Sequence, residues 1–184
     1  MRQLPNLLTT LRLLLTVPIA LLLLAERYGQ ALSLFAVAGF SDALDGFLAR
    51  RFGWTSRIGS MLDPIADKLL LVTSYLCLSV TQIFPWWLAA VVLLRDAVIV
   101  GGATLYRLLV GPFEFRPTWL GKLSTLLQIV LVLVVLLELS LLPAFAPLRW
   151  PLIVLALAVS LASGLHYVWV WARKFHSARN GPLA

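Results

Sequence analysis

The sequence predicts an all-α integral membrane protein with six transmembrane helices, and three observations support this fold class. Of the 184 residues, 61% are hydrophobic and 12% are charged, whereas a soluble domain is about half apolar and about a quarter charged. Long apolar segments alternate with short polar breaks along the whole chain. Most Lys and Arg residues lie just beyond the ends of those segments, which is typical of anchoring at a negatively charged leaflet.

Six segments are long and apolar enough to cross a bilayer, which takes roughly 20 residues per helix. They are expected at residues 6–25, 30–50, 58–80, 85–110, 118–142 and 150–172. The breaks between them are short, so residues 1–184 are expected to form a single transmembrane domain. The first segment follows basic residues as a signal peptide does, but no cleavage motif of the A-x-A type follows it, and we expect a retained helix.

The positive charges predict which side of the membrane each end of the chain occupies. If the N-terminus is cytoplasmic, ten Lys and Arg residues in the breaks and termini lie on that side, and two, Arg27 and Arg149, lie on the other. Because Lys and Arg favour cytoplasmic loops, both termini are expected in the cytoplasm. The net charge is +7, but the Lys and Arg residues do not form a basic run with interleaved aromatic residues. No nucleic-acid partner is therefore expected.

Four aspartates stand in otherwise apolar sequence. Asp42 and Asp45 are three residues apart near the cytoplasmic end of the second segment, and Asp63 and Asp67 are four apart near the start of the third. Each pair therefore lies on one helical face, and the short break makes the two helices antiparallel neighbours. Four carboxylates at one depth in the membrane repel one another. The nearby cations Arg50 and Lys68 are two charges and cannot neutralise four acids. A hard divalent metal bound by oxygen ligands would do so, and two would form a clamp for displacement at phosphorus.

Small residues accompany the acids. Gly46 and Ala49 share the second segment with the first pair, and Gly59 lies one turn before the second pair. They would let a bulky ligand approach the helix backbone, while Arg50 could pair with a phosphate or with the acids. Structural ion pairs at helix ends would explain any one of these acids. They explain four at helical spacing, with glycines between them, much less well.

This stretch resembles the signature of the CDP-alcohol phosphotransferase family of integral membrane enzymes, D-x2-D-G-x2-A-R-x8-G-x3-D-x3-D. The chain from Asp42 to Asp67 matches all eight fixed positions within 26 residues, and the six-helix architecture is also the family's. The resemblance implies transfer of a phosphatidyl group from CDP-diacylglycerol to an alcohol, with release of CMP, in phospholipid biosynthesis. It also implies an active site at the cytoplasmic face and a homodimer.

The resemblance implies a role for each matching residue. Two divalent ions, Mg²⁺ or Mn²⁺, would be held by Asp42, Asp45, Asp63 and Asp67, and Asp67 would also act as general base toward the acceptor hydroxyl.

The resemblance also implies a donor site, in which the CDP part of the donor would contact Gly46, Ala49, Arg50 and Gly59. The opening "PNLLTTLRLLL" resembles the family's first helix, which adds Asn6 and Thr9 to the donor site. Arg12 is expected either to face the bundle, with a role at the donor site, or to snorkel to the cytoplasmic interface.

The fourth and fifth segments are expected to select the acceptor alcohol. Arg95 and Asp96 lie well inside the fourth segment, where adjacent opposite charges partly compensate one another. We expect an anion-binding arginine oriented by an acid, with a structural ion pair as the alternative. Arg116 and Lys122, at the start of the fifth segment, complete a cationic cluster suited to an acceptor that carries a phosphate, although ordinary positive-inside loop charge explains them equally well.

Two subfamilies resemble this half of the chain. Phosphatidylglycerophosphate synthases, which use glycerol 3-phosphate, typically carry a further arginine where this chain has Ala103. CMP-forming cardiolipin synthases share the R-D start, small residues in mid-helix and a P-T-x-x-x-K-x-x-T-x-x-Q pattern that matches Pro117 to Gln128. In that case Gly101, Gly102 and Ala103 would make room for a second lipid. Phosphatidylglycerol is therefore the favoured acceptor, and glycerol 3-phosphate the alternative.

A cation-coupled transporter is the remaining alternative, because transporters also place acids in membrane helices. Transporter acids tend to lie near the bilayer midplane, whereas these gather at one end of their helices. The chain also shows no inverted repeat of the aspartate pattern.

Overall fold

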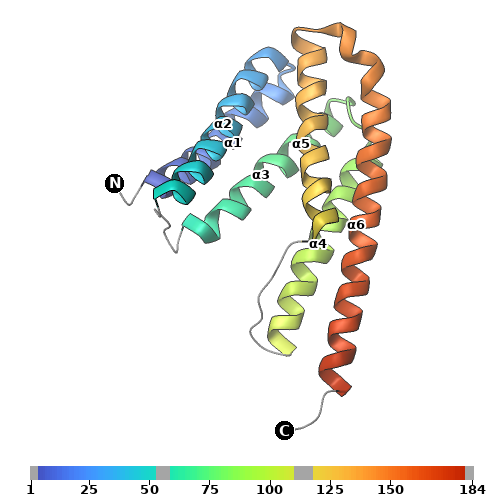
Figure 1. The fold of residues 1–184 in the computed structure, drawn as a ribbon. Coiled ribbons are helices and arrows are strands. Elements are labelled where there is room, and N and C mark those ends of the chain that lie inside the picture. Colours follow the sequence, from blue (N-terminus) through green and yellow to red (C-terminus); the bar gives the residue numbers. More distant parts are fainter. Residues whose placement is uncertain (1–3, 53–58, 110–117, 181–184) are drawn as a thin grey trace. The chain divides into compact units, whose positions relative to one another are not determined.

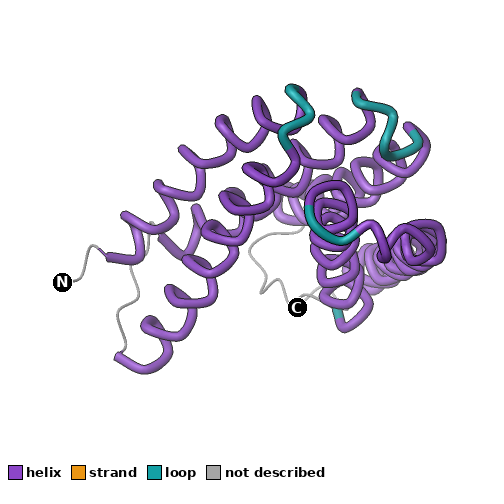
Figure 2. Tube along the Cα trace, turned by 90° about the horizontal axis from the view of Figure 1, so that it is seen from above, coloured by secondary structure: helices purple, strands orange, loops and turns teal. Residues whose placement is uncertain are grey.

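The structure is a computed structural model that describes residues 4–52, 59–109 and 118–180, with side chains described for residues 10–41, 66–109 and 118–173. The described residues form six α-helices and one short 3-10 helix, and they contain no strand (Figures 1 and 2). The elements are α1 (Leu4–Leu24), α2 (Tyr28–Phe52), α3 (Gly59–Val80), α4 (Trp86–Leu109), α5 (Trp119–Ser140), η1 (Pro143–Phe145) and α6 (Ala146–Asn180). The all-α class is thereby confirmed.

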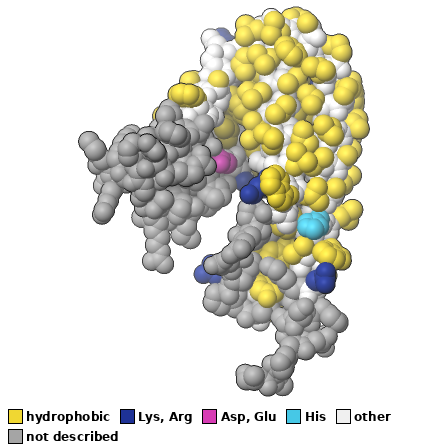
Figure 3. All heavy atoms as spheres, viewed as in Figure 1, with side chains coloured by type: hydrophobic (Ala, Val, Ile, Leu, Met, Phe, Trp, Pro, Cys, Tyr) yellow, Lys and Arg dark blue, Asp and Glu magenta, His cyan; other side chains and the backbone are white. Residues whose placement is uncertain are grey.

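Three helices in the described part of the chain are long and apolar enough to cross a membrane, over Trp86–Leu109, Trp119–Ser140 and Pro143–Arg173. Thr10–Leu24 is a shorter apolar helix. Large apolar side chains remain exposed along these helices, as Figure 3 shows over α5 and α6. Such a surface is stable against lipid and not against water. The chain is therefore a membrane protein, while six spans with both termini in the cytoplasm stay a prediction.

The helices group into two compact units. Unit 1 comprises residues 1–85 and 132–149, and unit 2 comprises residues 86–131 and 150–184. Along the chain, the divisions between the units fall between α3 and α4, within α5, and near the start of α6. In unit 1, α1 packs against both α2 and α3.

Two helices of unit 1 end in the same way. After α1, the Glu26 N–H donates to the Leu23 carbonyl at 3.1 Å and the Arg27 N–H donates to the Leu22 carbonyl at 2.8 Å. This is the Schellman pattern, which needs a left-handed residue after the helix. Glu26, with φ 57°, has that conformation, and Gln82 has it after α3, with φ 61°. The tight turn after α1 reverses the chain, so α2 returns antiparallel to α1.

An ion pair joins the end of α5 to the start of α6, within unit 1. The Arg149 Nε donates to Oε2 of Glu138 at 2.8 Å, and Nη2 of the same guanidinium donates to Oε1. The Glu138 side chain is 7% exposed. Both oxygens of the carboxylate are thus held by one planar guanidinium, a bidentate geometry that fixes the orientation of both groups.

Candidate active site

The predicted acidic site lies on α2 and α3 of unit 1. The first two aspartates of the signature belong to α2, which ends at Phe52, and the other two belong to α3, which begins at Gly59. Figure 1 shows that the end of α2 and the start of α3 lie at the same end of unit 1 as the start of α1. The helices therefore bring both acid-bearing stretches to one end of the unit. The side chains of Asn6, Thr9, Asp42, Asp45, Ala49, Arg50 and Asp63, and the surroundings of Gly46 and Gly59, lie outside the described residues.

Asp67 is the predicted metal ligand whose side chain the structure describes, and it is ion-paired with an arginine of another helix. Nη1 of Arg12, on α1, donates to Oδ1 of Asp67, on α3. The Arg12 side chain is 1% exposed, and that of Asp67 is 45% exposed. The cation is therefore held inside the unit while its acid remains accessible. Such burial excludes snorkelling of Arg12 and confirms that it faces the bundle.

The sequence of α1 explains why Arg12 points inward. Arg12, Thr16, Ile19 and Leu23 are all buried, and their spacing of three to four residues forms a single stripe along the helix. The Thr16 hydroxyl donates to the Arg12 carbonyl at 2.9 Å, one turn away. Arg12 thus continues the packed face of α1 toward the N-terminal end, where it meets Asp67 and not an apolar residue.

A groove of about 380 Å³ is lined by residues of α1 and α3, the two helices that the ion pair joins. Leu13, next to Arg12 in sequence, and Leu69, two residues after Asp67, belong to its lining. The rest of the lining is Thr16, Val17, Ala20, Leu21 and Thr73. Apart from two hydroxyl groups these side chains are apolar, so the groove can accept a hydrocarbon chain.

The donor set of the predicted metal site fits a hard divalent cation. Carboxylate oxygens are the ligands that Mg²⁺ and Mn²⁺ prefer, and Asp67 presents a partly exposed carboxylate. Among the side chains that the structure describes, no three His, Cys, Asp or Glu gather into a possible metal site, because three of the four predicted ligands lie outside that part of the chain. Metal binding by the four aspartates stays a prediction.

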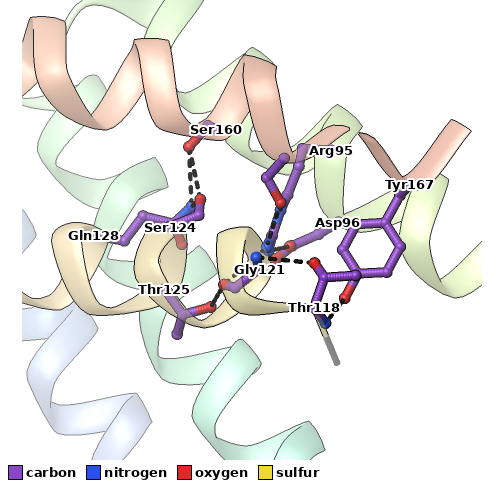
Figure 4. Close-up of polar contacts among 10 residues, drawn as sticks. Arg95, Asp96, Thr118, Gly121, Ser124, Thr125, Gln128, Ser160 and Tyr167 are labelled. Atoms are coloured by element: carbon purple, nitrogen blue, oxygen red, sulfur yellow. Dashed lines mark hydrogen bonds and ion pairs between the residues drawn. The ribbon is translucent and has the colours of Figure 1, made fainter. Parts of the chain in front are cut away.

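Arg95, predicted to bind an anion, is held by the helices of unit 2 (Figure 4). Its Nε and Nη2 donate to the Ser163 hydroxyl of α6 at 3.3 and 3.1 Å, and Nη2 also donates to the Gly121 carbonyl of α5 at 3.1 Å. Nη1 donates to the carboxylate of Asp96 at 2.6 Å. Every nitrogen of this buried guanidinium thus has a partner within the chain. These contacts favour the structural ion pair, and acceptor binding by Arg95 stays a prediction.

The start of α5 is built around Thr118. Its hydroxyl accepts a hydrogen bond from the Gly121 N–H at 3.1 Å, which is the geometry of a helix N-cap. The Thr118 N–H donates to the hydroxyl of Tyr167, on α6, at 3.0 Å. Lys122 follows in the first turn with an exposed side chain, and its Nζ lies 5.8 Å from the ring centre of Trp119. The fourth predicted acceptor residue, Arg116, lies outside the described residues.

Further along α5, buried polar side chains tie it to α6. The hydroxyls of Ser124 and Ser160 are 3.1 Å apart, and Nε2 of Gln128 donates to them at 3.3 and 3.4 Å (Figure 4). The Thr125 hydroxyl donates to the carbonyl of Gly121 at 3.2 Å. Thr118, Thr125 and Gln128, which belong to the pattern shared with cardiolipin synthases, therefore form hydrogen bonds with other residues of this chain. Sequence reasoning missed the partners on α6, whose signal is Ser160 and Ser163 spaced at i,i+3 in an apolar helix.

The small residues in the middle of α4 correct one expectation. A Cβ on Gly102 would lie 2.6 Å from the indole of Trp171, on α6, and Ala103 packs against the cluster that contains this indole. These two residues therefore make room for α6 and not for a second lipid. A Cβ on Gly101 would meet nothing within 4 Å, so of these three residues Gly101 is the one that leaves the expected room for a lipid.

Comparisons with known proteins agree with the signature. Residues 2–162 match the family model for CDP-alcohol phosphatidyltransferase. The chain is 35% identical over 182 residues to a protein of Schizosaccharomyces pombe named "Cardiolipin synthase (CMP-forming) / mitochondrial hydrolase fusion protein". The aligned region covers 89% of this chain and 30% of that protein. It is 35% identical over 177 residues to a "Probable phosphatidylglycerophosphate synthase" of Mycobacterium tuberculosis, covering 90% of this chain and 80% of the relative.

A "Cardiolipin synthase (CMP-forming)" of Rattus norvegicus is 34% identical over 144 residues, covering 70% of this chain and 48% of the rat protein. The chain thus spans less than half the length of the yeast and rat relatives. The family model, by contrast, accounts for most of this chain, and the mycobacterial relative is matched over four-fifths of its length. The chain therefore belongs to the CDP-alcohol phosphatidyltransferase family of transferases.

Proposed function

We propose that the protein transfers a phosphatidyl group from CDP-diacylglycerol to an alcohol and releases CMP. The observation that carries the proposal is the complete eight-position signature from Asp42 to Asp67. Two helices carry it at one end of unit 1, and its last acid has a partly exposed carboxylate. Family membership supports the same reaction.

In the proposed reaction the acceptor oxygen forms a bond to the lipid-bearing phosphorus as the bond from that phosphorus to CMP breaks. Asp67 takes the proton of the attacking hydroxyl, as a general base must lie within reach of the proton that it removes. Asp42, Asp45, Asp63 and Asp67 would hold Mg²⁺ or Mn²⁺, which when bound supplies positive charge beside the diphosphate.

The donor is proposed to lie along α1, α2 and α3. Its nucleotide part contacts Asn6, Thr9, Gly46, Ala49, Arg50 and Gly59, as the resemblance implies. The apolar groove between α1 and α3 supports a substrate that carries hydrocarbon chains.

Phosphatidylglycerol is the proposed acceptor, which would make the protein a CMP-forming cardiolipin synthase. The Arg95–Asp96 pair within α4 and the threonine–lysine–threonine–glutamine pattern from Thr118 to Gln128 support this choice, as do the names of the yeast and rat relatives. Arg116 and the exposed Lys122 are proposed to attract the acceptor phosphate, and Arg95 with Asp96 to hold the helix that carries Lys122. Glycerol 3-phosphate is the second candidate, because the mycobacterial relative is named a probable phosphatidylglycerophosphate synthase.

The proposed setting is a single transmembrane domain with six spans and both termini in the cytoplasm, which places the acids at the cytoplasmic face. A homodimer is proposed from the family resemblance. Cysteine-accessibility labelling of both termini in sealed vesicles tests the topology, and crosslinking in native membranes tests the dimer. Labelling of a terminus from the outer side, or crosslinking that yields monomer alone, would remove the respective proposal.

The reaction is tested by CMP release from CDP-diacylglycerol by the purified protein with Mg²⁺, comparing phosphatidylglycerol with glycerol 3-phosphate. The expected result is turnover with phosphatidylglycerol that is abolished in Asp67→Asn, with the unfolding temperature showing that this variant remains folded. Turnover with glycerol 3-phosphate alone would overturn the acceptor and leave the reaction class intact. Turnover that persists in folded Asp67→Asn would overturn the role of the acid.

A further inference from the structure

We infer that Arg12 is a positioning residue for the proposed transfer reaction: its guanidinium orients the carboxylate of Asp67. The inference rests on the proposed function, in which Asp67 accepts a proton and shares a metal site. It adds a residue of α1 that lies outside the signature, and it assigns to that residue a role toward the acid and not toward the donor.

The different burial of the two partners indicates that Arg12 orients Asp67, and not the reverse. The Asp67 side chain is 45% exposed, so packing alone does not restrict its carboxylate to one rotamer. The Arg12 side chain is 1% exposed, so the surrounding helices fix its position. Since Nη1 of Arg12 donates to Oδ1 of Asp67, the rigid partner determines which way the second carboxylate oxygen points.

The backbone around Arg12 strengthens the anchor. Its carbonyl accepts the hydroxyl of Thr16 one turn along α1, and Thr16 itself is buried at the edge of the groove between α1 and α3. Catalytic groups need such support, because a side chain displaced by about 0.5 Å or 10–20° loses its productive geometry. Arg12 thus holds the base from a helix that carries none of the four acids.

Arginine suits this role better than lysine would. A guanidinium is planar and presents its N–H groups in fixed directions, whereas an ammonium is a point charge on a flexible stem. If Arg12 only neutralised Asp67, lysine would serve as well. If Arg12 orients Asp67, lysine retains the charge and loses the direction. Arg12→Lys therefore separates orientation from neutralisation.

The test compares Arg12→Gln and Arg12→Lys with Arg149→Gln. Arg149 also forms an ion pair with a buried acid in unit 1, but its partner is Glu138 at the junction of α5 and α6, and neither residue belongs to the proposed site. For each variant we would measure kcat, KM for CDP-diacylglycerol, the unfolding temperature and the binding of Mn²⁺ by electron paramagnetic resonance.

Arg12→Gln is expected to lower kcat by about 10- to 100-fold and to weaken Mn²⁺ binding by at least about tenfold, which is the usual cost of removing the partner of a metal ligand. KM for the donor is expected to stay close to that of the wild type. Arg12→Lys is expected to give an intermediate kcat. Arg149→Gln is expected to lower the unfolding temperature and to leave both kcat and Mn²⁺ binding unchanged.

Each other outcome would overturn the inference. A kcat of Arg12→Gln equal to that of Arg149→Gln would show a structural role alone, and tighter Mn²⁺ binding would show that the guanidinium competes with the ion. If Arg12→Gln does not fold, Arg12→Lys decides, and a wild-type kcat in that variant rules out orientation. A wild-type protein that releases no CMP would instead contradict the proposed function, so the two failures are distinguishable.

Discussion

Two buried arginines, one in each unit, show how the same pair of residue types serves different purposes. Arg12 and Arg95 are 1% and 5% exposed, and each donates to an aspartate. Arg95 also donates to Ser163 and Gly121, which lie on two other helices, and its aspartate is 14% exposed. The aspartate of Arg12 is 45% exposed and ends the family signature.

Under the proposed function, the exposure of the acid, and not the burial of the cation, separates the site in unit 1 from the structural clamp in unit 2. A carboxylate enclosed with its arginine can act only within the fold, whereas one at the surface can also meet a substrate. In unit 2 the guanidinium donates to a carbonyl of α5 and to a serine hydroxyl of α6, and so ties α4 to both helices. In unit 1 the guanidinium supports an acid that solvent and ligands can reach.

The largest expected effect comes from exchanging the two acids for amides. Asp67→Asn is expected to lower kcat by about 10²- to 10⁴-fold, the usual contribution of a general base. Its change in unfolding temperature is expected to be the smaller one, because the side chain is partly exposed and the amide oxygen can still accept from Arg12. Asp96→Asn is expected to show the opposite profile, with its larger effect on the unfolding temperature. Steady-state CMP release and thermal unfolding in detergent measure both. Equal loss of kcat in the two variants would break the comparison.

Removing Arg95 is expected to lower the stability of the protein. Arg95→Met leaves Asp96 without this cation and removes the donors to Ser163 and Gly121, so the free energy of unfolding should fall by about 3–5 kcal/mol, as when one partner of a buried pair is removed. Arg107→Met, at the exposed end of α4, is the control and should change little. Denaturant titration in detergent measures the difference. A stable Arg95→Met protein whose KM for the acceptor alone rises would restore the anion-binding role predicted from the sequence.

The neighbouring glycines of α4 provide a matched pair that sharpens the description of unit 2. Gly102→Ala places a methyl group 2.6 Å from the Trp171 indole and is expected to lower the free energy of unfolding by about 1–3 kcal/mol through overpacking. Gly101→Ala meets nothing within 4 Å and should be neutral or stabilising by about 0.5–1 kcal/mol, since alanine favours a helix. Similar effects of both substitutions on the unfolding temperature would contradict the packing of Trp171 against α4.

The smallest expected effect is a gain of stability in unit 1, away from the acids. Gln82 has a φ of 61°, a conformation that glycine adopts without the steric cost of a side chain. Gln82→Gly is therefore expected to stabilise the protein by up to about 1 kcal/mol while kcat stays unchanged. Thermal unfolding and CMP release together check this. A fall in stability would show that the Gln82 side chain contributes more than its backbone conformation costs.

The helices were predictable from hydrophobic segments, with small errors at their ends. The segment expected at 58–80 is the helix Gly59–Val80, and the one expected at 85–110 is Trp86–Leu109. The sixth helix is longer than its expected range of 150–172 and runs over Ala146–Asn180. Apolar composition marks where a helix can meet lipid, whereas helical hydrogen bonds continue into polar sequence beyond that point, so the longer end was not predictable from hydropathy.

The sequence by itself determined the helical class, the acids of the signature and the family, because apolar length and helical spacing are local properties of the chain. Only the tertiary structure decided which partner each charged residue meets. Arg12 and Asp67 are 55 positions apart and Arg95 and Ser163 are 68 apart, and no local pattern relates such distant residues. Tertiary packing likewise filled the space beside Gly102 with an indole, since a glycine shows that room exists and the fold determines what occupies it.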